Sequence, residues 1–233
     1  SFAVVGHYDV VLQARDSAGA TTTQQLTVTV MNAPAGSRPT QSAPIAFDAT
    51  GGRTWSVNPD NDSVSRIQSN GAVLEIGLGT GTRPRSVATD ASGNAWVTCE
   101  GTDEIVIVSP AGALIDAIAL AYGSAPFGIA FTPDKASALV TMHGKGELWR
   151  FSGSTRQSTG TLALGATARA IAITSNGARA LVTRFISPDS GAQVWDVALG
   201  AGLTLTRTIT LAEDVATPET QSRGRGLPNY LAS

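Results

Sequence analysis

The feature that most constrains this chain is a motif that recurs at a fixed interval. A branched apolar residue followed by alanine opens a short, strand-like segment at positions 45, 87, 129 and 171, so successive segments start 42 residues apart. The four segments are Ile45–Asp48, Val87–Asp90, Ile129–Thr132 and Ile171–Thr174. A polar turn follows each of them. A repeat of this length indicates a supersecondary unit that is copied and stacks on its neighbours.

Each repeat holds enough strand-like sequence for four short strands. Second strands are predicted at 55–58, 96–99, 139–142 and 181–184, third strands at 63–67, 104–108, 147–151 and 193–197, and fourth strands at 73–76, 114–118, 160–164 and 206–209. No helical period competes with this pattern. Four strands in about forty residues are typical of a β-propeller blade, so we predict an all-β fold of antiparallel four-stranded blades. Face-to-face packing would bury Trp96, Ile107, Leu148 and Trp195 between blades.

Residues 1–31 predict a separate element, a β-hairpin. Tyr8, Val10 and Leu12 alternate with other residues as in a half-buried strand, and a second alternating segment ends at Val30. Asp16–Gly19 supplies the turn between them. Two strands cannot bury a face by themselves. Residues 32–42 are rich in Pro, Gly and Ser and predict a linker, after which residues 43–233 form the partial propeller, with a fifth blade starting near residue 231.

Three stretches of the repeats resemble a known family. Residues 55–64, 81–90 and 123–134 resemble the YVTN-type repeats of seven-bladed propellers in bacterial and archaeal cell-surface proteins. The resemblance covers roughly residues 43–211 and implies a secreted, periplasmic or cell-surface protein, although such propellers serve many functions. Cys99 stands where the family pattern has Asn. Four blades are visible where the family usually has seven, so we expect missing sequence, self-assembly or a partner chain to complete the ring.

The two ends of the chain carry further resemblances. Residues 6–10, 14–19 and 26–30 resemble the last two strands of Ig-like, cadherin-like and PKD-type β-sandwich domains, which implies that the chain is a fragment of an extracellular protein. Residues 224–233 are similar to tails of propellers that are joined to a di-haem peroxidase-like module. This second resemblance implies an alternative function, as the scaffold of a larger periplasmic redox enzyme whose catalytic module lies outside this chain.

Composition excludes several classes of protein. Sixteen Lys and Arg against eighteen Asp and Glu leave a net charge of −2 with no basic stripe, so we expect no nucleic-acid partner. No apolar run approaches the roughly 20 residues of a membrane span. Cys99 is the sole cysteine and is predicted to be a small buried apolar residue at a strand end, since no histidine lies nearby in sequence. His7 and His143 form no haem or zinc motif, so we expect no cofactor and no metal.

One acidic turn leaves two interpretations open. Asn58, Asp60 and Asp62 space oxygen ligands at every second residue, as calcium loops do. The glycine and glutamate of the helix-loop-helix calcium site are missing from this segment. Asp and Asn are also the residues that a tight turn between two strands prefers, and this second interpretation is the one we favour.

The candidate binding residues lie just before or within the first strand of each repeat. They are Arg83, Arg85, Phe127 and Arg169, together with Arg225 in the approach to the predicted fifth blade. The first strand of a propeller blade is innermost, so these side chains would surround the mouth of the central channel and attract a carboxylate, a phosphate or an acidic surface. The alternative is that each arginine pairs with an aspartate such as Asp48 or Asp90 and only closes the blade.

These observations favour a non-catalytic binding or structural module that acts as an interaction scaffold for a protein or polymer partner. No acid–base constellation is visible that would make the chain an enzyme by itself. A lactonase-like hydrolase would need His, Glu and Asp gathered at the channel mouth, and the repeats do not supply that set.

Overall fold

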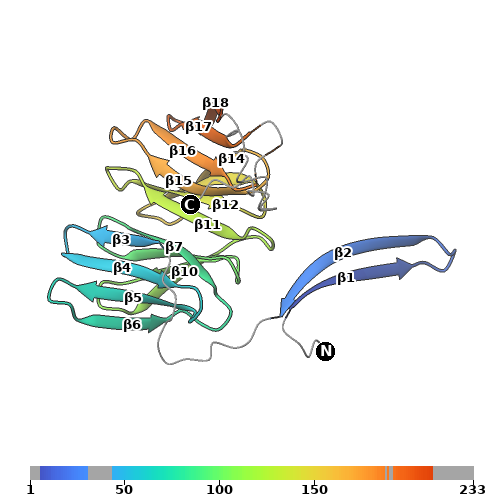
Figure 1. The fold of residues 1–233 in the computed structure, drawn as a ribbon, viewed down its shortest axis with the longest axis horizontal. Helices are drawn as coiled ribbons and strands as arrows, with labels where there is room; N and C mark the ends of the chain where they lie inside the picture. Colours follow the sequence, from blue (N-terminus) through green and yellow to red (C-terminus); the bar gives the residue numbers. More distant parts are fainter. Residues whose placement is uncertain (1–5, 31–43, 187, 189–190, 212–233) are drawn as a thin grey trace, which may run out of the picture. The chain divides into compact units, whose positions relative to one another are not determined.

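The computed structural model describes residues 6–30, 44–186, 188 and 191–211 (Figure 1). The chain divides into two compact units, residues 1–37 and 38–233. The predicted linker at 32–42, the approach to a fifth blade and Arg225 lie outside the described residues. In the described part of the chain, no helix is long and apolar enough to cross a membrane.

The first unit contains an antiparallel hairpin. Strand β1 (Gly6–Arg15) pairs with β2 (Thr21–Val30), and the register runs from Gly6 opposite Val30 to Arg15 opposite Thr21. Asp16 Oδ1 accepts hydrogen bonds from the backbone N–H groups of Ala18 (2.9 Å) and Ala20 (2.8 Å), and Gly19 adopts a φ of +91°. The predicted turn is therefore confirmed. Val11 and Leu12 point to opposite faces and are both exposed, as expected of a two-stranded sheet.

The second unit contains four antiparallel sheets, each of four strands in chain order. Blade 1 comprises β3 (Ile45–Asp48), β4 (Arg53–Asn58), β5 (Ser63–Gln68) and β6 (Val73–Gly77); blade 2 comprises β7 (Pro84–Thr89), β8 (Ala95–Cys99), β9 (Glu104–Val108) and β10 (Leu114–Ala119). Blade 3 comprises β11 (Pro126–Phe131), β12 (Ser137–Met142), β13 (Glu147–Ser152) and β14 (Ser158–Ala163); blade 4 comprises β15 (Ala168–Ile173), β16 (Arg179–Arg184), β17 (Gln193–Ala198) and β18 (Thr204–Thr210). The predicted β-propeller architecture is confirmed.

The first strand of each blade is innermost. Strands β3 and β7, β7 and β11, and β11 and β15 lie next to one another, and Figure 1 shows the sheets following each other in sequence order. The repeat residues occupy matching registers, because Val87, Ile129 and Ile171 pair with Val97, Val140 and Val182 at one position of the second strand. Gly128 permits this packing, since a Cβ on it would stand 2.3 Å from the carbonyl oxygen of Arg169 on the next inner strand.

The core lies between the blades. Trp96, Ile107 and Leu148 are completely buried and Trp195 is 3% exposed, as the sequence predicts. Trp96 of blade 2 meets Phe131 of blade 3 edge to face, with ring centroids 5.2 Å apart and planes at 88°. Aromatic pairs favour this geometry, so the interface of blades 2 and 3 combines apolar burial with a defined orientation.

Two open faces contrast with these interfaces. Ile45 on β3 is 69% exposed, whereas its equivalents Val87 and Ile129 are 4% and 6% exposed. Leu181 on β16 is 36% exposed, whereas Trp96 and Leu139 at the equivalent position are fully buried. Among the described residues, no further sheet packs on the outer faces of blades 1 and 4.

Threonines fix the spacing between neighbouring inner strands. The hydroxyl of Thr98 accepts a hydrogen bond from Ser86 N–H in its own blade (3.0 Å) and donates one to the carbonyl of Phe127 in the next blade (2.6 Å). Thr141 repeats the arrangement one blade later, between Gly128 N–H (2.8 Å) and the carbonyl of Arg169 (2.6 Å). The backbone at Phe127 and Arg169 is therefore held by the preceding blade.

Candidate functional site

The structure brings three of the predicted residues to one end of the inner strands. Arg85, Phe127 and Arg169 are each the second residue of an inner strand, in β7, β11 and β15 respectively. Arg83 directly precedes β7 and adopts a left-handed φ of +47°. We call this end of the strands the mouth, and the opposite end, where the inner strands turn into the second strands, the far end.

Two aspartates, the buried Asp62 and the partly exposed Asp103, shape the loops that lead into the mouth. Asp62 accepts hydrogen bonds from the N–H groups of Gly81 (2.7 Å) and Arg83 (2.8 Å). Asp103 does the same for Gly123 (2.8 Å) and Ala125 (2.6 Å). Both carboxylate oxygens of Asp62 therefore accept backbone N–H groups of the loop that leads into blade 2.

Three further residues join the cluster from the ends of the second strands. Glu100, His143 and Phe185 directly follow β8, β12 and β16. Their backbone N–H groups bond the carbonyls of Arg83 (3.2 Å), Ala125 (3.0 Å) and Thr167 (2.9 Å), beside the inner strands. The mouth cluster is therefore Arg83, Arg85, Glu100, Phe127, His143, Arg169 and Phe185. The sequence-based prediction missed these three, although their spacings of 43 and 42 residues follow the repeat.

Glu100 neutralises the arginines of blade 2. Arg85 donates to Glu100 Oε2 through Nε at 2.6 Å and lies within 2.5 Å through Nη2, and Arg83 Nη2 lies 3.6 Å from the same oxygen. The carboxylate partner of Arg85 and Arg83 is therefore Glu100, and not Asp48 or Asp90, which we considered as alternative partners. Asp90 follows Arg85 by five residues of extended strand, about 17 Å along the chain, so its carboxylate lies at the far end.

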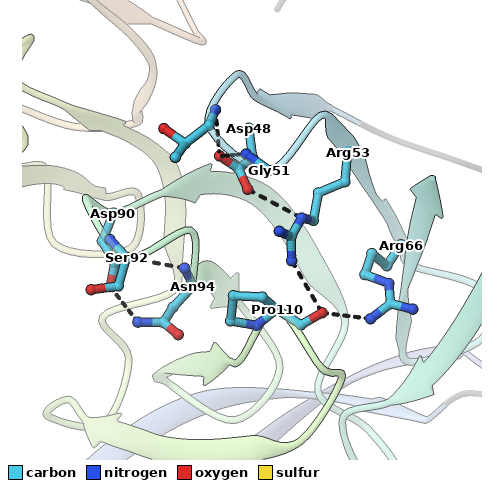
Figure 2. A network of polar contacts seen from close by, with 9 residues as sticks. Asp48, Gly51, Arg53, Arg66, Asp90, Ser92, Asn94 and Pro110 are labelled. Atoms are coloured by element: carbon cyan, nitrogen blue, oxygen red, sulfur yellow. Dashed lines mark hydrogen bonds and ion pairs between the residues drawn. The ribbon is translucent and has the colours of Figure 1, made fainter. Parts of the chain in front are cut away.

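The aspartates of the far end have other partners (Figure 2). Asp48 Oδ2 lies 3.2 Å from Arg53 Nε, and Asp90 accepts hydrogen bonds from the N–H of Ser92 (2.9 Å) and from the N–H and side-chain amide of Asn94 (2.9 and 2.8 Å). Figure 2 also shows Arg53 and Arg66 both donating to the carbonyl of Pro110 in blade 2, at 3.3 and 2.5 Å. The far end therefore forms a structural network that joins blades 1 and 2.

Arg169 lies against two aromatic rings. Its guanidinium carbon lies 4.3 Å from the ring centroid of Phe127 and 3.7 Å from that of Phe185. No carboxylate among the described residues pairs with it, and its buried Nε has no hydrogen-bond partner there. Burial lowers the pKa of Arg169, the positive charge of Arg85 lowers it further, and Glu100 opposes both effects. In contrast, Arg179 and Arg207 of the same blade both bond the buried Asp196.

His143 completes the aromatic lining. Its ring centroid lies 5.9 Å from that of Phe127 and 6.0 Å from that of Phe185. Its Nδ1 is buried without a hydrogen-bond partner among the described residues. Burial is the main cause that lowers the pKa of His143; Arg169 and Arg85 contribute in the same direction, and Glu100 and the backbone of Ala168 oppose them. The imidazole is therefore neutral at pH 7.

The mouth cluster combines three arginines with one carboxylate, so it carries excess positive charge beside aromatic rings. Cys99 lies next to Glu100 but is fully buried, and burial together with the charge of Glu104 raises its pKa to about 12. A thiol with that pKa is not a nucleophile at neutral pH. In the described residues, no group of three or more His, Cys, Asp or Glu side chains is arranged to hold a metal ion. This chemistry is suited to binding an anion.

Comparisons with known proteins address the fold. No family model and no curated protein matches the chain. Among solved structures, a streptogramin B lyase is similar with a TM-score of 0.65 and 16% identity over 88% of this chain and 63% of its own. Hydrazine synthase from Kuenenia stuttgartiensis gives a TM-score of 0.66 and 16% identity over 77% and 52% of the respective chains. Virginiamycin B lyase from Staphylococcus aureus gives 0.62 and 14% identity over 88% and 60%.

These neighbours are propeller-type proteins and support the fold that the blades show. The chain spans between 52% and 63% of the length of these three solved structures. At identities of this size, the likeness concerns the fold alone.

Proposed function

We propose that this chain is the propeller part of a non-catalytic interaction scaffold that binds an acidic protein or polymer partner at the mouth cluster. Arg83, Arg85, Phe127 and Arg169 belong to this surface, and Arg225 is added to it from the sequence alone. The setting we propose is a secreted, periplasmic or cell-surface protein with the YVTN-type propeller and Ig-like hairpin that the sequence resembles.

One observation carries the proposal, namely that the mouth holds a cation without a matching carboxylate. Glu100 is shared by Arg85 and Arg83, while Arg169 has no carboxylate partner among the described residues. Desolvating an unpaired cation costs free energy, so the arrangement is better explained by an anion that binds from outside than by the stability of the blade. Positive charge focused at a channel mouth also accelerates the approach of an acidic partner.

The open faces support a second kind of partner, further blades that complete the ring. Ile45 and Phe47 on β3 are 69% and 65% exposed, although the interior blades bury the residue equivalent to Ile45. Apolar strand faces of this kind are aggregation-prone unless they are covered. We propose that longer sequence or a partner chain supplies the missing blades.

A redox scaffold is the alternative function. The tail at 224–233 resembles those of propellers joined to a di-haem peroxidase-like module, and one structural neighbour is named a hydrazine synthase. In that case the whole protein would contain a cofactor-bearing module elsewhere. Haem absorbance of the whole protein, isolated from its source, would favour this alternative over the non-catalytic scaffold.

The test of the scaffold proposal is direct binding to a model acidic polymer. The intact protein is immobilised, and biolayer interferometry follows the binding of poly-L-glutamate and of poly-L-lysine at low and high salt. We expect poly-L-glutamate to bind at low salt, poly-L-lysine not to bind, and salt to weaken the complex, because exposed charges are screened. Absence of poly-L-glutamate binding at low salt would overturn the proposal.

A further inference from the structure

The surroundings and the planar shape of the Arg169 guanidinium limit the direction from which a ligand can bind it. Its central carbon lies over the rings of Phe127 and Phe185, 4.3 and 3.7 Å from their centroids, so both rings are cation–π partners of the group. The N–H donors of a guanidinium lie at its edge, in its own plane. An acceptor that satisfies several of them at once must therefore approach in that plane.

The neighbours of Arg169 cannot supply that acceptor. Glu100 is the carboxylate of the mouth cluster, and it is bound to Arg85 through two nitrogens. The ring of His143 packs against both phenylalanines, and an imidazole offers at most one acceptor nitrogen, which cannot satisfy several N–H donors at once. The carbonyl of Arg169 is itself bound by Thr141, which fixes the backbone from which the side chain projects.

We propose that Arg169 is the specificity-determining residue of the mouth, and that it binds a carboxylate group of the partner in its plane through two parallel N–H···O hydrogen bonds. This inference rests on the proposed function and names the chemical class of its ligand. The carboxylate is that of a Glu or Asp side chain or of a chain terminus. Phe127 and Phe185 restrict the movement of the guanidinium. The ion pair of Arg85 with Glu100 lines the neighbouring side of the site.

The first experiment uses the unmodified protein. In ¹H–¹⁵N spectra of the intact ¹⁵N-labelled protein, the Nε–H resonance of Arg169 is identified as the one that disappears in Arg169→Lys. We expect triglutamate to shift this resonance, and triglutamine at equal concentration and ionic strength to leave it in place. The proposal is overturned if triglutamate leaves the resonance unmoved, or if inorganic phosphate shifts it as much as triglutamate does.

The second experiment separates shape from charge. Arg169→Lys keeps the positive charge but removes the planar fork, so we expect triglutamate to bind at least about tenfold more weakly. Arg156→Gln is the matched control, because Arg156 pairs with Asp116 at the far end of blade 3, and we expect it to bind as the wild type does. Far-UV circular dichroism confirms that each variant is folded. Equal affinity of wild type and Arg169→Lys would overturn the proposal.

The two proposals fail in distinguishable ways. If the intact protein does not bind poly-L-glutamate, the scaffold function itself is wrong. If it binds poly-L-glutamate but Arg169→Lys retains full affinity for triglutamate, the acidic partner is recognised by diffuse charge, and only the role of Arg169 is wrong.

Discussion

The two ends of the inner strands satisfy their polar groups in different ways. At the far end, Asp90 and Asp48 accept hydrogen bonds from their own turns, and Arg53 donates to a carbonyl of the next blade. At the mouth, Arg169 lies against aromatic rings without a carboxylate among the described residues. The same strands therefore end in a structural network on one side and in unsatisfied charge on the other. On this difference we base the proposal that the mouth serves recognition, while the far end stabilises the blades.

The largest expected effect concerns the far end. Asp90 accepts hydrogen bonds from the N–H of Ser92, the N–H and side-chain amide of Asn94, and Trp96 Nε1 at 3.2 Å. We expect Asp90→Ala to lower the free energy of unfolding by about 3 kcal/mol, because it leaves buried donors without acceptors. Urea titration followed by Trp fluorescence measures this change. Ser92→Ala, at an exposed position in the same turn, should stay within about 0.5 kcal/mol of wild type.

The next effect concerns Thr141, whose hydroxyl links the inner strands β11 and β15. Thr141→Val keeps the shape but leaves Gly128 N–H and the carbonyl of Arg169 without the hydroxyl. We expect a loss of about 1–2 kcal/mol in urea titrations. Thr159→Val, which removes an exposed hydroxyl in β14, serves as the control. Equal losses in the two variants would show that the link between blades contributes no special stability.

Cys99 tests whether the residue beside Glu100 belongs to the core or to the mouth. Its pKa is raised from 9.0 to about 12 in the folded protein, so above pH 9 the unfolded chain loses the thiol proton while the folded chain keeps it. The free energy of unfolding therefore falls as pH rises from 9 to 12, by on the order of 1 kcal/mol per pH unit from this residue. Comparison with Cys99→Ala isolates the contribution. Identical alkaline profiles would place the thiol in solvent.

The smallest effect on stability is expected at the mouth. Arg169→Met retains apolar contact with Phe127 and Phe185 and removes a desolvated charge, so the free energy of unfolding should remain within about 0.5 kcal/mol of wild type or rise slightly. Thermal and urea unfolding measure it. A loss as large as that of Asp90→Ala would remove the distinction between the two ends.

The repeat made the fold predictable, because Val87, Ile129 and Ile171 recur at one interval and occupy one register. The same interval located Arg85, Phe127 and Arg169. The partner of Arg85 was not predictable in this way: Glu100 lies beyond the end of β8, and only the antiparallel return of that strand brings it beside β7. Asp90 is closer to Arg85 in sequence and was therefore the expected partner. An extended strand lies between the two residues, however, and places them at opposite ends of the sheet.

For a related reason, His143 and Phe185 were not predicted to belong to the mouth cluster. Each follows a second strand and looks like an ordinary turn residue in the sequence, and its role depends on Phe127 or Arg169, which belongs to another strand. A comparison of all equivalent positions across the repeats, including those in turns, would have found them at the same spacing.

The threonine links have a consequence for how such a surface can be altered. Thr98 and Thr141 bind the main-chain carbonyls of Phe127 and Arg169 and make no use of their side chains. The framework therefore tolerates exchange of either side chain while its anchoring bonds persist. Blades 3 and 4 each offer one such interchangeable position, at Phe127 and at Arg169, so the proposed ligand preference could be altered by substituting one residue in either blade.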